Sequence, residues 1–74
     1  MREIPIRGEM IRLGELLKLA GVVGTGGEAK LLLASEEVRV NGEPESRRGR
    51  QLRAGDEVLV GDETLRVAAP RSAG

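Results

Sequence analysis

The spacing of the hydrophobic residues changes along this 74-residue chain, and that change limits the folds it can adopt. From Ile11 to Ala20 the leucines recur at the three- and four-residue spacing of a helical stripe. After Glu37 the period becomes two, because Val38 and Val40 alternate with a charged residue. Helices therefore precede most of the strands. We predict an α+β fold in which two short, packed helices lie against a small, mainly antiparallel sheet.

The two helices have clear start and stop signals. The first is predicted over residues 11–20 and ends at Gly21. The second begins at Thr25, because Thr25 and Glu28 fit a capping box, and it ends near Ser35. The apolar residues predicted to share a face of the first helix are Leu13, Leu16, Leu17 and Ala20. Those of the second are Ala29, Leu32 and Leu33, with Leu31 widening the stripe.

Short strands are predicted on both sides of the helices. Residues 1–8 read as an edge strand interrupted by Pro5, and the chain should reverse at Asn41-Gly42. Residues 43–51 show neither a helical nor a strand period and read as a polar loop. A hairpin with strands around 58–60 and 65–67 follows, and residues from Ala68 onward read as a tail.

Composition favours a binding module over an enzyme. Residues 1–74, of which 39% are apolar, are enough for one small domain. The chain has no Cys, His, Phe, Tyr or Trp, which excludes thiolate or imidazole zinc sites, nucleophile–His dyads and base stacking on aromatic rings. We predict neither a cofactor nor a metal. The acids in the final hairpin read as turn residues: Asp56, Glu57, Asp62 and Glu63.

The charges sum to zero but are unevenly distributed. Residues 47–53 contain four arginines and no acid, and guanidinium groups bind phosphate well: the four are Arg47, Arg48, Arg50 and Arg53. The alternative is a solvated loop in which these arginines pair with Glu43 and Glu45. No apolar run approaches the roughly 20 residues that span a bilayer, and we expect a cytoplasmic protein without membrane contact.

The start of the second helix is another candidate anion site. Free amides at Gly26-Gly27 and the helix dipole favour negative charge, and Lys30 adds a cation one turn later. The alternative is ordinary capping, in which Glu28 competes with any phosphate.

An ordered set of motifs resembles a known family, the S-four domain, or αL RNA-binding motif, named for a small-subunit ribosomal protein. The motifs are Arg12-Leu13-Gly14-Glu15-Leu16-Leu17, Thr25-Gly26-Gly27-Glu28-Ala29-Lys30, Leu32-Leu33, Val38-Arg39-Val40-Asn41-Gly42 and Gly55-Asp56. They cover about residues 10–60, and residues 41–50 resemble the stand-alone, single-domain bacterial members. The chain departs from the family pattern in three places: Gly14 replaces Asp, Gly26 replaces an Arg that touches RNA, and Glu36 replaces Gly.

The resemblance implies RNA binding without catalysis, with structured ribosomal or transfer RNA, and possible ribosomal subunits, as partners. The candidate RNA-binding residues are Arg12, Gly27, Lys30, Arg47, Arg48, Arg50 and Arg53. Two alternatives remain. The same fold could serve as an adaptor between proteins, and Val40-Asn41-Gly42 with Gly55-Asp56 is also similar to β-grasp sulfur carriers, although those end in Gly-Gly.

Overall fold

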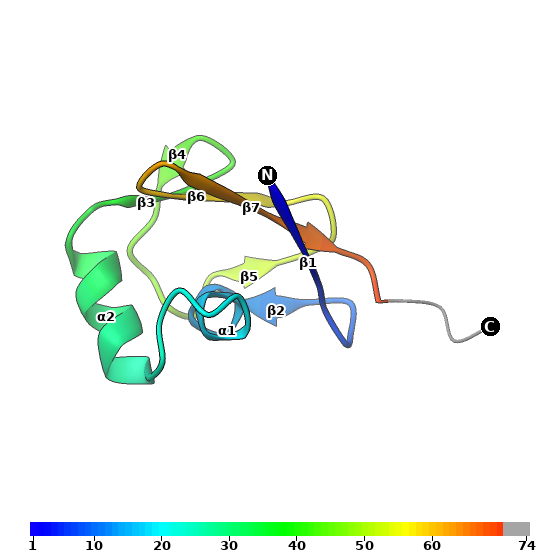
Figure 1. Cartoon of the computed structure of the whole chain (residues 1–74), viewed down its shortest axis with the longest axis horizontal. Coiled ribbons are helices and arrows are strands. Elements are labelled where there is room, and N and C mark those ends of the chain that lie inside the picture. Colours follow the sequence, from blue (N-terminus) through cyan, green and yellow to red (C-terminus); the bar gives the residue numbers. More distant parts are fainter. Residues whose placement is uncertain (71–74) are drawn as a thin grey trace.

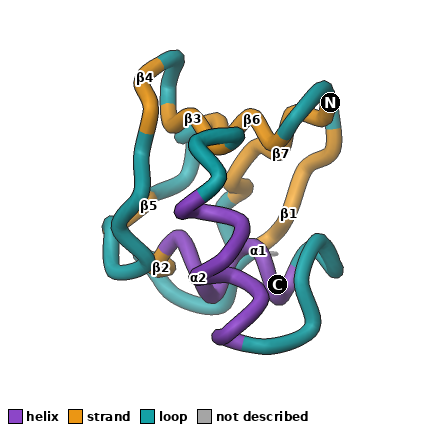
Figure 2. The backbone as a smooth tube through the Cα atoms, turned by 90° about the vertical axis from the view of Figure 1, so that its left-hand side faces the viewer, coloured by secondary structure: helices purple, strands orange, loops and turns teal. Residues whose placement is uncertain are grey.

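The computed structural model describes residues 1–70, which form two layers (Figure 1). One layer is a five-stranded sheet, and the other contains both helices and a two-stranded ribbon (Figure 2). The sheet has the order β1 (Arg2–Pro5), β7 (Glu63–Ala68), β6 (Glu57–Val60), β3 (Val38–Val40) and β4 (Glu43–Pro44). The second layer comprises α1 (Leu13–Leu19), α2 (Gly26–Ala34) and the ribbon of β2 (Ile11–Arg12) with β5 (Gln51–Leu52).

The predicted α+β fold with a mainly antiparallel sheet is confirmed. Within residues 1–70, β1 and β7 form a parallel pair and the other strand pairs are antiparallel. The first strand lies at the edge of the sheet, where Pro5, which has no N–H, ends it. Ala68 belongs to β7, and its carbonyl accepts a bond from the Ile6 N–H at 3.2 Å, so the predicted tail began too early. Residues 71–74 lie outside the described residues.

The first helix starts two residues later than predicted. Ile11 and Arg12 form a strand that pairs with Leu52 and Gln51, which lie 41 and 39 residues further along the chain, so local periodicity cannot reveal the pairing. The predicted apolar face is confirmed, since all four of its residues are buried: Leu13, Leu16, Leu17 and Ala20. Gly21, with φ +76°, follows the helix in the left-handed region that suits glycine.

The second helix has the predicted Thr25 cap, with one change. The Thr25 hydroxyl accepts a bond from the Glu28 N–H at 3.1 Å. The Glu28 carboxylate accepts from the Gly24 N–H at 3.4 Å, one residue before the amide that a capping box would use. Ala29 and Leu33 are buried, but Leu31 is 73% exposed. Leu31 lies about 200° around the helix from Ala29, so the predicted widening of the apolar face is wrong.

The turn at Asn41-Gly42 joins two strands, as predicted. Both residues have positive φ, +50° and +86°, which matches the right-handed twist of a tight hairpin. The next segment is not entirely a loop. Glu43 and Pro44 form β4 against Val40 and Arg39, and Gln51 belongs to β5.

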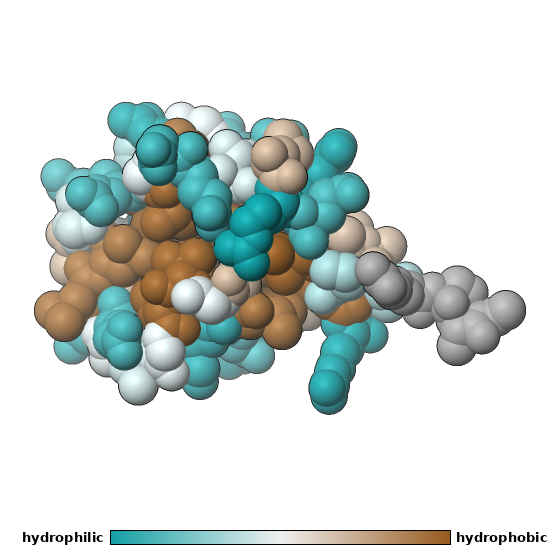
Figure 3. Space-filling model, in the orientation of Figure 1, coloured by the Kyte–Doolittle hydropathy of each residue, from teal (hydrophilic) through white to brown (hydrophobic). Residues whose placement is uncertain are grey.

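The core lies between the two layers. Fully buried leucines of both helices and of the ribbon face valines of the sheet, including Val38 and Val58. Figure 3 shows apolar surface at the side of this core, as brown that runs across the middle of the molecule between the strands and the helices in the orientation of Figure 1. The most exposed large apolar side chains of the described residues are Met1, Met10, Leu19 and Leu31. Within these residues, no helix has the length and hydropathy needed to cross a membrane.

Candidate nucleic-acid interface

The segment that joins β4 to β5 is anchored on the start of α1. The Leu13 N–H donates to the Arg50 carbonyl at 2.8 Å, and the Gly14 N–H donates to the Arg48 carbonyl at 3.0 Å. The first amides of a helix have no partner within the helix, and here two of them are used by the loop. This anchoring brings the arginine-rich loop, residues 45–50, against the helical layer.

Arg48 lies between the starts of both helices, where two glycines leave room for it. A Cβ built on Gly14 would lie 3.5 Å from the Cβ of Arg48, and one built on Gly26 would lie 3.6 Å from its Nη1. The residues at these two positions thus present no side chain to Arg48. The guanidinium consequently reaches across to the first residue of α2.

Arg48 shares an open hollow of about 320 Å³ with two further cations, Arg12 and Lys18. Glu15 is the acid in its lining, so the lining has a formal charge of +2. The full lining is Arg12, Gly14, Glu15, Lys18, Gly26, Ala29, Arg48 and Gly49. No carboxylate within residues 1–70 forms an ion pair with these three cations. We call this surface the basic hollow.

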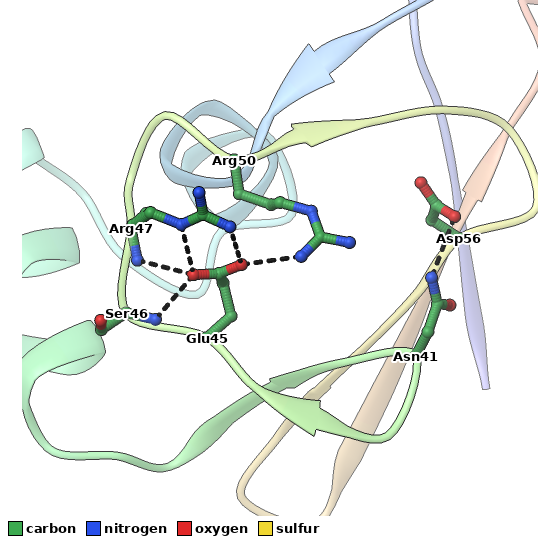
Figure 4. A network of polar contacts seen from close by, with 6 residues as sticks. All are labelled: Asn41, Glu45, Ser46, Arg47, Arg50 and Asp56. Atoms are coloured by element: carbon green, nitrogen blue, oxygen red, sulfur yellow. Dashed lines mark hydrogen bonds and ion pairs between the residues drawn. The ribbon is translucent and has the colours of Figure 1, made fainter.

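The other two arginines of the loop surround one carboxylate, Glu45 (Figure 4). Arg47 binds it through Nε and Nη2, both at 3.1 Å, and Arg50 binds it through Nη1 at 2.8 Å. The backbone N–H groups of Ser46 and Arg47 also donate to it, each at 3.1 Å. Hydrogen bonding from Arg47, aided by Arg50 and opposed by burial, lowers the pKa of Glu45 from 4.5 to about 2. The predicted alternative of pairing within the loop is therefore confirmed for Glu45.

The pairing does not remove Arg47 and Arg50 from the surface. The Arg47 side chain is 73% exposed and that of Arg50 35%, whereas the Glu45 side chain is 8% exposed. Arg47 and Arg50 line a second hollow that shares Gly49 with the basic hollow. The two arginines thus form a cationic surface next to it. Glu43, the other predicted partner, forms no ion pair within residues 1–70.

The structure brings together some of the predicted residues and separates others. Arg12 and Arg48 line the basic hollow, with Arg47 and Arg50 beside it. The remaining three candidates are exposed and do not line either hollow: Gly27, Lys30 and Arg53. The amide of Arg53 donates to Asp56 at 2.8 Å, so Asp56 is a turn residue as predicted. Glu57 and Glu63 were also predicted as turn residues, but they are the first residues of β6 and β7.

Lys18 is the residue that sequence reasoning missed. Arg12 precedes α1, and Glu15 and Lys18 follow it at intervals of three, a spacing that places them along one side of the helix. That spacing was visible in the sequence, and it predicts that Lys18 lies on the same side of the helix as the candidate RNA-binding residue Arg12.

Two packed helices against a small, mainly antiparallel sheet are the architecture of an S4-type domain. The chain belongs to the S4 domain family, whose model matches residues 4–68. It is also similar to a protein of Bacillus subtilis (strain 168) named "Probable ribosome maturation protein RlbA". The two are 56% identical over 57 residues, which cover 77% of this chain and 80% of the relative. The resemblance inferred from the motifs is confirmed.

Proposed function

We propose that this protein binds structured RNA of the ribosome, or transfer RNA, without catalysing a reaction. The observation that carries this proposal is the basic hollow, where Arg12 and Lys18 of the continuous β2–α1 segment meet Arg48 of the loop between β4 and β5. No carboxylate of residues 1–70 forms an ion pair with these three cations. Membership in the S4 domain family and a relative named for ribosome maturation support an RNA partner. A cytoplasmic location and the absence of a cofactor or metal stay predictions.

The contact is with phosphates, and RNA shape decides which phosphates can be reached at once. A guanidinium fork matches two phosphate oxygens, and Lys18 adds a point charge. The chain has no aromatic residue on which a splayed base could stack, so we expect weak discrimination between sequences. Net charge is zero, and binding therefore depends on where the cations lie rather than on their total.

The test compares two double variants that remove the same charge. Lys18→Ala with Arg48→Ala removes two cations from the basic hollow. Arg39→Ala with Arg66→Ala removes two from the outer face of the sheet, since each lies between inward-facing, buried neighbours. Affinity for purified ribosomal RNA and for total transfer RNA is measured at fixed salt, with circular dichroism as the check on folding.

We expect the first double variant to lose affinity roughly tenfold or more, because charge-assisted hydrogen bonds are lost, and the second to lose much less. Equal losses in two folded variants would mean that general charge, and not the basic hollow, governs binding. Failure of the unmodified protein to bind either RNA would overturn the proposal.

A second candidate function, that of an adaptor between proteins, has one observation in its favour. On the other side of Glu15 and Lys18 lies an open hollow of about 470 Å³ with apolar side chains from β2, α1 and the loop before β2, including Met10, Ile11 and Leu19. An adaptor would keep its partner in a pull-down after ribonuclease treatment. An RNA-binding protein would lose it.

A further inference from the structure

We propose that Glu45 is a positioning residue of the RNA-binding surface: its carboxylate fixes Arg47 and Arg50 so that their remaining N–H donors face an RNA phosphate. This inference rests on the proposed function. It assigns a supporting role in RNA binding to an acid, the type of residue that simple electrostatics predicts should weaken RNA binding.

The geometry at Glu45 orders the loop from one side. Its Oε2 atom accepts from the backbone amides of Ser46 and Arg47 and from the Arg47 Nε. Its Oε1 atom accepts from Arg47 and from Arg50. Two parallel bonds to the Arg47 guanidinium fix its plane as well as its position.

The other side of the loop is fixed by backbone bonds to α1. The carbonyls of Arg48 and Arg50 accept from the Gly14 and Leu13 amides, so the loop is held at both of its halves. Arg48 is thereby placed in the basic hollow while Arg47 and Arg50 are placed beside it. The loop is therefore anchored in two ways: by backbone hydrogen bonds to α1 and by the side chain of Glu45.

The arginines keep most of their donors for a ligand. A guanidinium has five N–H donors. Arg47 gives two to Glu45 and Arg50 gives one, which leaves three and four respectively. Because Glu45 is 8% exposed and Arg47 is 73% exposed, a ligand approaching the loop meets guanidinium groups before it meets the carboxylate.

Ordered arginines bind a phosphate with a smaller loss of conformational entropy than free ones. Long side chains lose rotamer freedom when a ligand immobilises them, and a group already held in place has less to lose. An exposed ion pair would contribute little to this effect. Here the side chain of the acid is only 8% exposed, and five hydrogen bonds from the loop hold it in place.

Glu45→Gln distinguishes positioning from simple charge repulsion, because the two effects have opposite signs. Loss of an acid beside RNA phosphates raises affinity if repulsion dominates. Loss of the arginine clamp lowers it if positioning dominates, and we expect a loss of about fivefold or more. Glu43→Gln is the matched control: it makes the same chemical change two residues away, at an acid without an ion pair in residues 1–70.

The experiment measures affinity for fragmented ribosomal RNA over a series of salt concentrations. For Glu45→Gln we expect weaker binding and a shallower dependence on salt, with the log–log slope reduced by about 1, because fewer cations are held against phosphates. A double-mutant cycle with Arg47→Ala should show coupling in RNA affinity, so that Glu45→Gln costs less once Arg47 is absent. A purely structural role would give neither the change of slope nor that coupling in folded variants.

Arg47→Lys provides a second variant in case Glu45→Gln does not fold. It keeps the charge but loses the planar pair of bonds, and we expect the same direction of change. The inference is overturned if the Glu45→Gln variant folds and binds RNA at least as tightly as the unmodified protein. If Glu45→Gln is unfolded, unchanged affinity of Arg47→Lys overturns it. RNA binding by the unmodified protein in either case leaves the proposed function standing, whereas no binding by that protein refutes the proposed function itself.

Discussion

The Nη1 nitrogen of Arg48 lies 3.6 Å from the point that a Cβ atom on Gly26 would occupy. A loop residue therefore places its charge where a side chain from the first residue of α2 would begin. The two positions are 22 residues apart in the chain, yet a side chain at residue 26 would start in contact with the Arg48 guanidinium.

Moving this cation from the loop to the helix is the first test of that relationship. Arg48→Ala should lower RNA affinity roughly tenfold, because one charge-assisted contact is lost. Adding Gly26→Arg to Arg48→Ala should recover much of the loss, since the new side chain starts beside the vacated site. Binding assays with ribosomal RNA measure both effects, and Arg66→Ala controls for the loss of one charge. A double variant that binds no better than Arg48→Ala would contradict the shared-site interpretation.

Salt dependence measures how many cations contact phosphate. If three to five of the clustered cations engage RNA, the log of the affinity should fall against the log of the salt concentration with a slope of about −2 to −4. Arg48→Ala should make this slope shallower by about 1, whereas Arg39→Ala should leave it unchanged. Titrations of RNA at several salt concentrations provide the slopes. A slope near zero for the unmodified protein would indicate that phosphate contacts do not drive binding.

Because of Glu45, the free energy of unfolding should depend on pH in the acid range. The folded-state pKa of Glu45 is about 2, below its usual 4.5, so the ionised form stabilises the fold. That stabilisation is present above the higher pKa and is lost as pH falls from about 4.5 towards 2. Denaturant unfolding at a series of pH values should show Glu45→Gln less stable than the unmodified protein at pH 7, with the difference shrinking through this acid window. A difference that is constant with pH would show that the ion pairs contribute nothing.

The helical leucines allow a matched test of core packing. Leu16 is fully buried, and Leu16→Ala should lower the free energy of unfolding by about 2–5 kcal/mol. Leu31→Ala makes the same chemical change at a side chain that is 73% exposed, and its effect should be within about 0.5 kcal/mol. Chemical denaturation of both variants supplies the two values. Similar losses would mean that Leu31 packs against something in solution.

Replacing either of two glycines by alanine should change the free energy of unfolding, in opposite directions. Gly14 lies in α1, where a Cβ makes ordinary contacts with Arg48, so Gly14→Ala should raise the free energy of unfolding by up to about 1 kcal/mol. Gly42 has φ +86°, and Gly42→Ala should lower it by about 1–2 kcal/mol because the left-handed region is strained for alanine. Thermal unfolding of the two variants provides the comparison. Destabilisation by Gly14→Ala would show that the close approach of Arg48 leaves no room for a methyl group.

The fold was predictable to the extent that local signals specify it. The stripe of Leu13, Leu16 and Leu17, the Thr25 cap and the turn at Asn41-Gly42 each act within a few residues, and all three are present in the structure. The start of α1 was misplaced because Ile11 pairs with Leu52. A strand partner 41 residues away leaves no trace in local periodicity.

The sequence by itself determined the class of fold, the arginine-rich segment and the family, because spacing and residue type carry those properties directly. Only the tertiary structure separated the arginines into two groups. Arg48 enters a hollow with Arg12 and the unpredicted Lys18, while Arg47 and Arg50 bind Glu45. The physical reason is that the number of charges can be read from the sequence, whereas the electrostatic potential at a surface depends on the distances between charges. Only the fold decides which charges lie within a few ångströms of one another.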